Sequence, residues 1–327
     1  MDVRTSAEFI ASTATSCTVD SNQCKVVAAQ IADSMSRKKY STETWAQHPL
    51  NPTEKSPETV DWIFTVDTLN FSFWSDSNDP LQQFTVNYDG VNYTGYWSLP
   101  AAINRALDEG IPITSPPFWS STKFTREVFA HIFRSETEAE IPLLDQRFKV
   151  LIEAANAMRR AGASSFVEIV QRANHSADTL IESVRSSMSS YNDVFTYCGY
   201  DVRILKRAQI LVGDLWACFN GQSYGKFDDI DSVTMFADYR VPQILYQLGC
   251  LKYSSDLEHK IRNGELLPSG SPEEIELRGC SIWAVEEIRS HLKGINSVLL
   301  DFYLWDTAKE QESAAVIPCH KTRSVFY

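Results

Sequence analysis

The chain lacks the spaced motifs that mark the common metal, phosphate and serine-triad sites. Its seven cysteines are widely separated and include no CxxC pair, which excludes a zinc knuckle and gives no disulfide framework. The six histidines form no HxxxH or HxH arrangement, and there is neither a glycine-rich phosphate loop nor a GxSxG elbow. The sequence therefore indicates no metal, nucleotide loop or serine triad, and the cysteines are expected to be buried thiols.

The chain also lacks an apolar run at its start and any cluster of basic residues, and both absences restrict what it is expected to bind. The start, Met1-Asp2-Val3-Arg4-Thr5, carries an early acid and no sustained apolar run, so we expect no secretory signal, no spanning helix and a cytoplasmic, or also nuclear, location. The 30 Lys and Arg residues are scattered among 42 Asp and Glu residues, which gives a formal charge of −12. This balance offers no basic surface to a nucleic-acid polymer or an anionic membrane, so a small ligand is the favoured partner.

What is present indicates a mainly helical fold. The 327 residues are 43% hydrophobic, enough for a full core, and no repeat, low-complexity segment or polar linker divides them. We therefore predict a single compact domain over residues 1–327. Apolar residues recur at spacings of three and four through most of 122–190, which is typical of helices. Asp89-Gly90, between two alternating runs, predicts a β-hairpin over about 84–97.

Other segments give more local expectations. Residues 6–39 are typical of one or two packed helices, and 62–74 is aromatic enough to form core. Residues 99–107 have a helical pattern, and the proline-rich 111–118 is expected to be a loop. In the first segment, the residues predicted to lie on a buried face are Val26, Val27, Ile31 and Met35.

The stretch around Asp238 places a carboxylate at the predicted start of a helix. Asp is a preferred N-cap, Pro242 is tolerated only in a first turn, and Gly249 would end a helix that begins at Tyr239. A helical stripe over 206–219 and a glycine-containing loop over 220–224 precede it. This order resembles the helix-hairpin-helix DNA glycosylases, in which an Asp just past the hairpin stabilises a sugar cation. The alternative is an ordinary N-cap.

Three other residues are candidates for a site. Pro49 and Pro52 favour an extended loop that would carry His48. Asp301 and Asp306 interrupt a strongly apolar run, and buried acids need partners or a function. On one helix they would point roughly 140° apart, so they could not form a paired dyad. Each could instead cap a helix or pair with an arginine, and His48 could be structural.

Taken together, several blocks of the chain resemble the queuosine salvage proteins, the queuosine 5'-phosphate N-glycosylases. The resemblance spans nearly the whole chain and is carried by 45–52, 67–74, 236–243, 301–306 and 320–327. It implies hydrolysis of queuosine 5'-monophosphate to queuine and ribose 5-phosphate, without a cofactor, for reuse of queuine in transfer RNA. Carried over, the base pocket falls on His48, Phe236, Asp238, Asp301, Phe302 and Asp306.

These residue types fit the implied chemistry. Cleavage of a ribosyl C–N bond develops an oxocarbenium cation, which a fixed carboxylate, Asp238 or Asp306, would stabilise. A second acid can accept hydrogen bonds from the guanine-like base while Phe236 and Phe302 stack on it. His48 is available for the cyclopentene substituent or its ammonium linker. A 7-deazapurine has no N7 to protonate, and the sequence names no other proton donor.

The substrate's phosphate requires cations in an otherwise acidic chain. Lys321 and Arg323 lie within 320–324 beside two hydroxyl residues, and Arg240 is a second candidate. The alternative is a solvated basic tail, although the following 325–327 could dock the terminus. Two other function classes stay open: a DNA-repair base glycosylase, disfavoured by the charge of −12, and a non-catalytic helical protein that only binds queuine.

Overall fold

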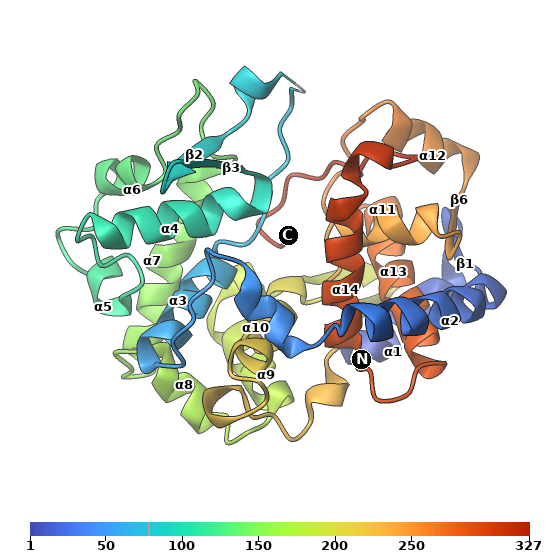
Figure 1. Cartoon of the computed structure of the whole chain (residues 1–327), viewed down its shortest axis with the longest axis horizontal. Coiled ribbons are helices and arrows are strands. Elements are labelled where there is room, and N and C mark those ends of the chain that lie inside the picture. The colour runs from blue at the N-terminus through green and yellow to red at the C-terminus, as the bar shows by residue number, and fades with distance from the viewer. Residues whose placement is uncertain (78) are drawn as a thin grey trace. The chain divides into compact units, whose positions relative to one another are not determined.

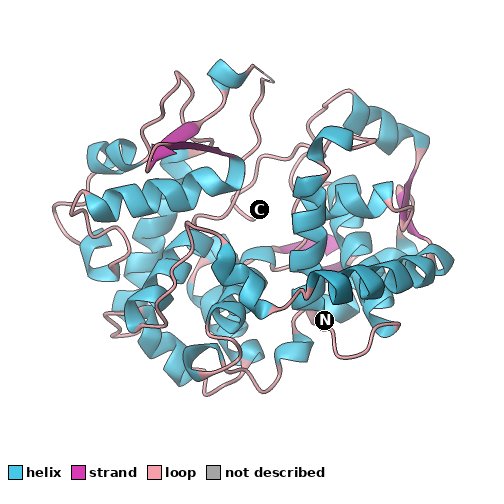
Figure 2. Cartoon of the chain, viewed as in Figure 1, coloured by secondary structure: helices cyan, strands magenta, loops and turns pink. Residues whose placement is uncertain are grey.

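The computed structural model describes residues 1–77 and 79–327, and helices account for most of its ordered structure (Figure 2). Strands are short, and in the described residues they pair as two-stranded antiparallel ladders: β1 with β6, β2 with β3 and β4 with β5. The mainly helical class and its small β-elements are therefore confirmed. Within the described residues, no helix is both long enough and apolar enough to cross a membrane.

The chain forms two compact units, which are described one at a time. Unit 1 comprises residues 1–42, 191–213 and 229–327, and unit 2 comprises 43–190 and 214–228. The single domain over 1–327 stays a prediction. The elements of unit 1 are α1 (Val3–Thr13), β1 (Cys17–Val19), α2 (Ser21–Lys38), β4 (Val194–Tyr197), β5 (Tyr200–Arg203), α11 (Arg240–Gln247), β6 (Leu251–Tyr253), α12 (Ser255–Arg262), α13 (Pro272–Ser290) and α14 (Ser297–Glu310).

Helix α10 (Lys206–Cys218), which is labelled in Figure 1, has residues 206–213 in unit 1 and 214–218 in unit 2. The elements of unit 2 are α3 (Pro57–Thr68), β2 (Thr85–Tyr88), β3 (Val91–Thr94), α4 (Ser98–Asp108), α5 (Pro116–Trp119), α6 (Arg126–Ile132), α7 (Leu144–Arg160), α8 (Phe166–Arg172) and α9 (Ala177–Ser187). Short 3₁₀ helices span Thr42–Gln47, Pro80–Gln82, Gly95–Trp97, Ser189–Tyr191, Ser223–Gly225, Ile230–Ser232 and Glu312–Ala314.

Helix α13 is the centre of unit 1. It packs against α1, α2, α11 and α14, so it is buried on nearly every side, as expected of a helix surrounded by others. Gly279 allows α1 to approach closely, because a Cβ there would lie 2.6 Å from atoms of Ile10. The burial extends to charged residues, and Arg278 is fully buried within this helix. The polar partners of α13 are therefore part of how unit 1 holds its shape.

The predicted N-terminal helices are present, but one predicted core residue is wrong. Val27, Ile31 and Met35 are buried on α2, whereas Val26 is 52% exposed. Positions 27, 31 and 35 are four residues apart and share one face, and residue 26 is turned about 100° away from that face. The strand β1 between the two helices was not predicted, because it pairs with β6, far along the chain.

In unit 2 the aromatic segment 62–74 enters the core for most of its length, as predicted. Phe64 of α3 stacks on Phe166 of α8 with ring centroids 3.9 Å apart. Arg147 of α7 is fully buried, donates to the carbonyl of Ser72 at 3.1 Å, and lies over the ring of Phe71 at 4.3 Å. The guanidinium therefore orders the turn that follows α3.

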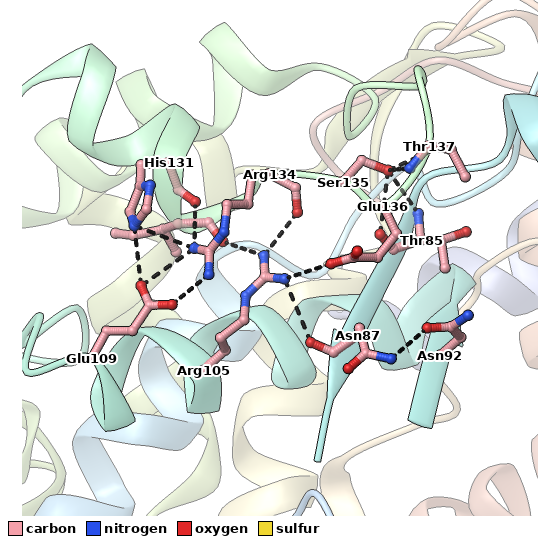
Figure 3. A network of polar contacts seen from close by, with 11 residues as sticks. Thr85, Asn87, Asn92, Arg105, Glu109, His131, Arg134, Ser135, Glu136 and Thr137 are labelled. Carbon is pink, nitrogen blue, oxygen red and sulfur yellow. Dashed lines mark hydrogen bonds and ion pairs between the residues drawn. The ribbon is translucent and has the colours of Figure 1, made fainter. Parts of the chain in front are cut away.

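The predicted β-hairpin is formed by β2 and β3, with Tyr88 opposite Val91. Asp89 and Gly90 both have positive φ, as a tight hairpin turn of the primed type requires. Figure 3 shows the polar network beside it, in which Arg105 of α4 donates to the carbonyls of Ile132 (3.2 Å) and Arg134 (2.8 Å). The hairpin is thereby attached to α4 and to the segment after α6.

Two connections differ from the sequence expectation, and a third agrees with it. The segment 111–118 is a loop only to Ser115, because Pro116 begins the single turn α5, a position that proline favours. The β4–β5 hairpin turns at Cys198-Gly199, and cysteine at positive φ is not a usual turn signal. The predicted order of helix, glycine-containing loop and helix from α10 to α11 is present, with 3₁₀ turns between them.

Candidate active site

Five of the predicted site residues come together in unit 1, at the contact between α11 and α14. Phe236 and Asp238 lie just before α11, while Asp301, Phe302 and Asp306 project from α14. The rings of Phe236 and Phe302 meet edge to face, with centroids 5.8 Å apart. The packing of the two helices therefore joins residues that are more than sixty positions apart in the sequence.

Helix α11 begins at Arg240, one residue later than expected, so Tyr239 is its N-cap residue, and the predicted cap, Asp238, binds the first turn from one position before it. Its Oδ1 accepts hydrogen bonds from the amides of Arg240 (2.8 Å) and Val241 (3.0 Å). Burial raises the pKa of Asp238, whereas the charge of Lys206 and the two amides lower it. Both of these hydrogen bonds use Oδ1. The same carboxylate can therefore bind the helix through Oδ1 and act in the site through Oδ2.

Asp301 is buried beside Asp238. Its Oδ1 accepts a hydrogen bond from the amide of Phe236 at 2.9 Å, so α14 holds the segment that leads into Asp238. Burial raises the pKa of Asp301 well above its ordinary value, and the neighbouring charge of Asp238 raises it further. Both carboxyls have raised pKa values, and because they are close together, ionisation of one disfavours ionisation of the other.

Asp306 is half-buried and faces a different partner. The hydroxyl of Tyr40, just past α2, donates to its Oδ2 at 2.5 Å. Burial raises the pKa of Asp306, and the bond from Tyr40 opposes that effect. Asp301 and Asp306 thus bond to an amide and a tyrosine, not to an arginine or a helix end. Tyr40 also lines a surface cavity of about 580 Å³ beside the segment that joins α13 to α14.

Sequence reasoning missed Lys206 and Tyr40. Lys206 is buried at the first position of α10, and its charge lowers the pKa of both Asp238 and Asp301. A signal was available for Lys206, because a lysine in the first turn of an apolar helix opposes the helix dipole and needs acidic neighbours. Nothing local distinguishes Tyr40, whose carboxylate partner lies 266 residues away in sequence.

The cationic candidates for the phosphate have several partners already. Arg240 forms an ion pair with Glu312. The main chain of Lys321 accepts a hydrogen bond from the amide of Leu267 at 2.8 Å, and Arg323 is half-buried. Tyr327 is buried, so the segment docks on unit 1, contrary to a solvated tail. A phosphate contact by Lys321 or Arg323 stays a prediction.

His48 belongs to unit 2, where it stacks on Trp97 with ring centroids 3.3 Å apart. Trp45 lies in a 3₁₀ helix that precedes His48, so the extended path predicted for 45–52 is wrong over its first residues. The amide of Leu50 donates to His48 Nδ1 at 3.3 Å, and burial lowers the pKa of His48 to about 4. The imidazole is therefore neutral, and its proton is on Nε2.

The loop that carries His48 is fixed by side chains from elsewhere in unit 2. The indole of Trp45 donates to Asp214 Oδ1 at 3.1 Å, and the Asn51 amide donates to the Trp45 carbonyl at 2.8 Å. Asn104 of α4 donates to the carbonyl of Leu50 at 2.9 Å. These bonds hold the His48 ring in one orientation, and Asp214 was not among the residues predicted from the sequence.

Comparison with known proteins identifies close relatives. The family model described as queuosine salvage protein matches residues 50–327. A protein of Schizosaccharomyces pombe is 44% identical, with 98% of each chain covered, and one of Nematostella vectensis is 43% identical, with 99% of this chain and 98% of the relative covered. A protein of Sphaerobacter thermophilus is 37% identical over 91% of this chain and 90% of its own. All three are named queuosine 5'-phosphate N-glycosylase/hydrolase.

Proposed function

Since this chain belongs to the queuosine salvage protein family, we propose that it is a hydrolase of the N-glycosidic bond in queuosine 5'-monophosphate. Water replaces the base at the anomeric carbon, so the products are queuine and ribose 5-phosphate. The observation that carries this proposal is the identity of 37–44% over nearly the full length to relatives of that name. The released queuine would be reused in transfer RNA.

Asp238 is the group that we assign to the sugar cation. Departure of the base leaves positive charge on the ribose ring, and a carboxylate held in place before the reaction stabilises that charge without reorganising. The nearby Lys206 and the two amides lower the pKa of Asp238 and so offset part of the increase that its burial causes, which supports its assignment to the sugar cation. Asp301 accepts a hydrogen bond from the Phe236 amide, and its pKa is raised well above the ordinary value, so we assign it to holding the segment before Asp238 and not to the sugar cation.

Asp306 is assigned to the leaving base. Its carboxyl is half-buried and oriented by Tyr40, which leaves it able to bond the donor edge of a guanine-like base. Phe302 is half-buried and supplies aromatic surface for that base, whereas Phe236 is only 2% exposed and supports the Phe302 ring by an edge-to-face contact. Binding the base through Asp306 and the sugar through Asp238 gives each carboxylate a separate catalytic role.

A substrate contact by His48, which belongs to unit 2, stays a prediction, and the hydrogen bonding of its ring limits the partner that it can take. Because Nδ1 already accepts a bond from Leu50, the neutral ring offers only its Nε2–H, which is a donor. An ammonium group also has only donors, so the ammonium linker is not a suitable partner for this ring. A hydroxyl of the cyclopentene substituent can accept that bond. The phosphate is assigned to Arg323 and Lys321, with Arg240 as the alternative.

The proposal is tested by incubating the purified protein with queuosine 5'-monophosphate and measuring free queuine and ribose 5-phosphate by mass spectrometry. Both products should appear in equal amounts, and Asp238→Asn should abolish most of the release. Tight binding of the nucleotide without release would favour the non-catalytic alternative. Release of bases from damaged DNA but none from the nucleotide would favour a DNA-repair glycosylase.

A further inference from the structure

Arg278 of α13 is a buried cation behind the candidate active site. Its Nη1 and Nη2 form a fork on the two oxygens of Asp193, at 3.1 Å and 2.6 Å, and Nη1 also contacts Glu274 Oε1 at 3.0 Å. One face of the guanidinium lies 4.0 Å from the ring centre of Tyr327. The side chains of Arg278, Asp193 and Glu274 are at most 2% exposed. A guanidinium held on so many sides has one available orientation.

Two hydrogen bonds connect the Arg278–Asp193 pair to the candidate site. The Nε of Arg278 donates to the carbonyl of Ala237 at 3.0 Å, and that carbonyl belongs to the peptide bond whose other half is the amide of Asp238. Asp193, on the other side of the guanidinium, accepts a hydrogen bond from the amide of Lys206 at 3.1 Å. Arg278 therefore fixes the position of Asp238 through the Ala237 carbonyl. Through Asp193 it also fixes the start of α10, which carries the buried Lys206.

Side chains of two helices, α14 and α13, form hydrogen bonds with the main chain of the segment 236–238. Asp301 of α14 binds the amide of Phe236, and Arg278 of α13 binds the carbonyl of Ala237. Resting on the activity proposed above, we infer that Arg278 is a positioning residue, which aligns Asp238 with the sugar cation through the Ala237 carbonyl and through Asp193. Arg278 does not contact the substrate in this arrangement, so its effect on the reaction passes through Asp238.

Arg278→Lys separates the positioning role from charge alone. A lysine keeps the positive charge beside Asp193 and Glu274, but its single ammonium cannot reproduce the fork and the bond to Ala237 together. Small misplacements of a catalytic group are costly, so we expect kcat to fall roughly tenfold to a hundredfold, with KM changed less than about threefold. A control is Arg105→Lys in unit 2, where another buried arginine bonds main-chain carbonyls (Figure 3). It should leave kcat nearly unchanged.

A double-mutant cycle with Asp238→Asn tests whether the effect passes through Asp238. If it does, adding Arg278→Lys to Asp238→Asn should lower kcat by no more than about threefold, because the group being positioned has already been lost. A purely structural role for Arg278 predicts the full tenfold to hundredfold loss in both backgrounds. Additive losses, or an unchanged kcat in Arg278→Lys, would overturn the inference.

A variant that does not fold and a wild-type protein without activity have different consequences for the inference. If Arg278→Lys does not fold, Asp193→Asn replaces it in the same cycle, since asparagine keeps one acceptor for the Lys206 amide but loses the charged fork. Additivity there overturns the inference equally. If the wild-type protein releases no queuine, it is the proposed function that fails, and this outcome is distinct from an active wild type with an additive cycle.

Discussion

At the scale of single residues, Asp238 combines hydrogen bonds to the first turn of α11 with the proposed role of stabilising the sugar cation. A capping side chain is ordered by the amides it accepts from, so its orientation is settled before any substrate arrives. The same bonds offset part of the cost of burying a charge. Structural and catalytic interpretations of this residue therefore predict different effects of the same substitution.

Replacing Asp238 with asparagine should lower turnover by at least about a hundredfold, because the preorganised negative charge is lost. The melting temperature should change little, since asparagine is as good an N-cap as aspartate. Asp2→Asn is the control, because the Asp2 side chain caps α1 by accepting a hydrogen bond from the amide of Thr5, and its replacement should not affect turnover. Near wild-type turnover in a folded Asp238→Asn protein would make Asp238 a cap only.

The His48 ring should remain neutral throughout the pH range in which the protein is studied. Burial lowers its pKa to about 4, so protonation becomes significant only as the pH falls toward that value. The unfolded chain binds this proton near pH 6.5, and the contribution of His48 to stability is therefore present above about pH 6.5 and is lost as the pH falls to about 4. An NMR titration of the imidazole protons measures this directly. A midpoint at or above 6 would remove the argument for a neutral Nε2–H donor.

At the scale of elements, the site depends on how closely α10 approaches Phe236. Gly213 lies in α10, and a Cβ at that position would be 2.5 Å from Phe236 Cζ and 3.1 Å from Val298 Cγ1. A helix interior normally prefers alanine to glycine by roughly 1 kcal/mol. The glycine is therefore explained by the space that the aromatic ring occupies and not by helix formation.

Gly213→Ala should destabilise the protein by about 1–3 kcal/mol and raise KM, because the added methyl group displaces the Phe236 ring. Urea unfolding and steady-state kinetics measure the two effects. In a Phe236→Ala background the same change should become neutral or stabilising, since the space is then free and helix propensity decides. A stabilising Gly213→Ala in the wild-type background would show that the ring adjusts without cost.

At the scale of the whole molecule, the proposed substrate is a dianionic nucleotide, whereas the chain itself is acidic. The net charge of −12 opposes the approach of a phosphate, so the attraction has to come from a few local cations. The segment that carries Lys321 and Arg323 is docked on unit 1 by the buried Thr322 and Tyr327, which gives these cations a defined place. Thr322 Oγ1 donates to the carbonyl of Leu267 at 3.0 Å.

Arg323→Ala should reduce kcat/KM for queuosine 5'-monophosphate by about 1.5–3 kcal/mol, the usual worth of a hydrogen bond to a charged group. Hydrolysis of the nucleoside, which lacks the phosphate, should be nearly unchanged. Lys252→Ala is the control, because it removes one exposed cation of unit 1 that pairs with Asp20. Equal losses on both substrates would assign Arg323 to the fold, and no loss on either would leave Arg240 as the next candidate.

Local patterns in the sequence were enough for the helical class, the β2–β3 hairpin and the position of Asp238 near the start of a helix, and blocks along the whole chain were enough for the family. Helix periodicity, turn residues and capping are decided within a few positions, so no tertiary contact is needed to predict them. The same reasoning was wrong at Val26, which lies off the buried face of α2. It was also wrong at Pro116, which begins a single helical turn instead of lying in a loop. The roles of individual site residues stay predictions.

Tertiary structure alone decided which groups surround Asp238. Lys206, Asp301 and Arg278 act on it from α10, α14 and α13, and β1 finds its partner only in β6. Contacts between such distant positions depend on how whole helices pack, and the packing depends on the shape of every buried side chain. A pKa shift or a positioning bond follows from that packing, so neither is visible in the residues next to Asp238 along the chain.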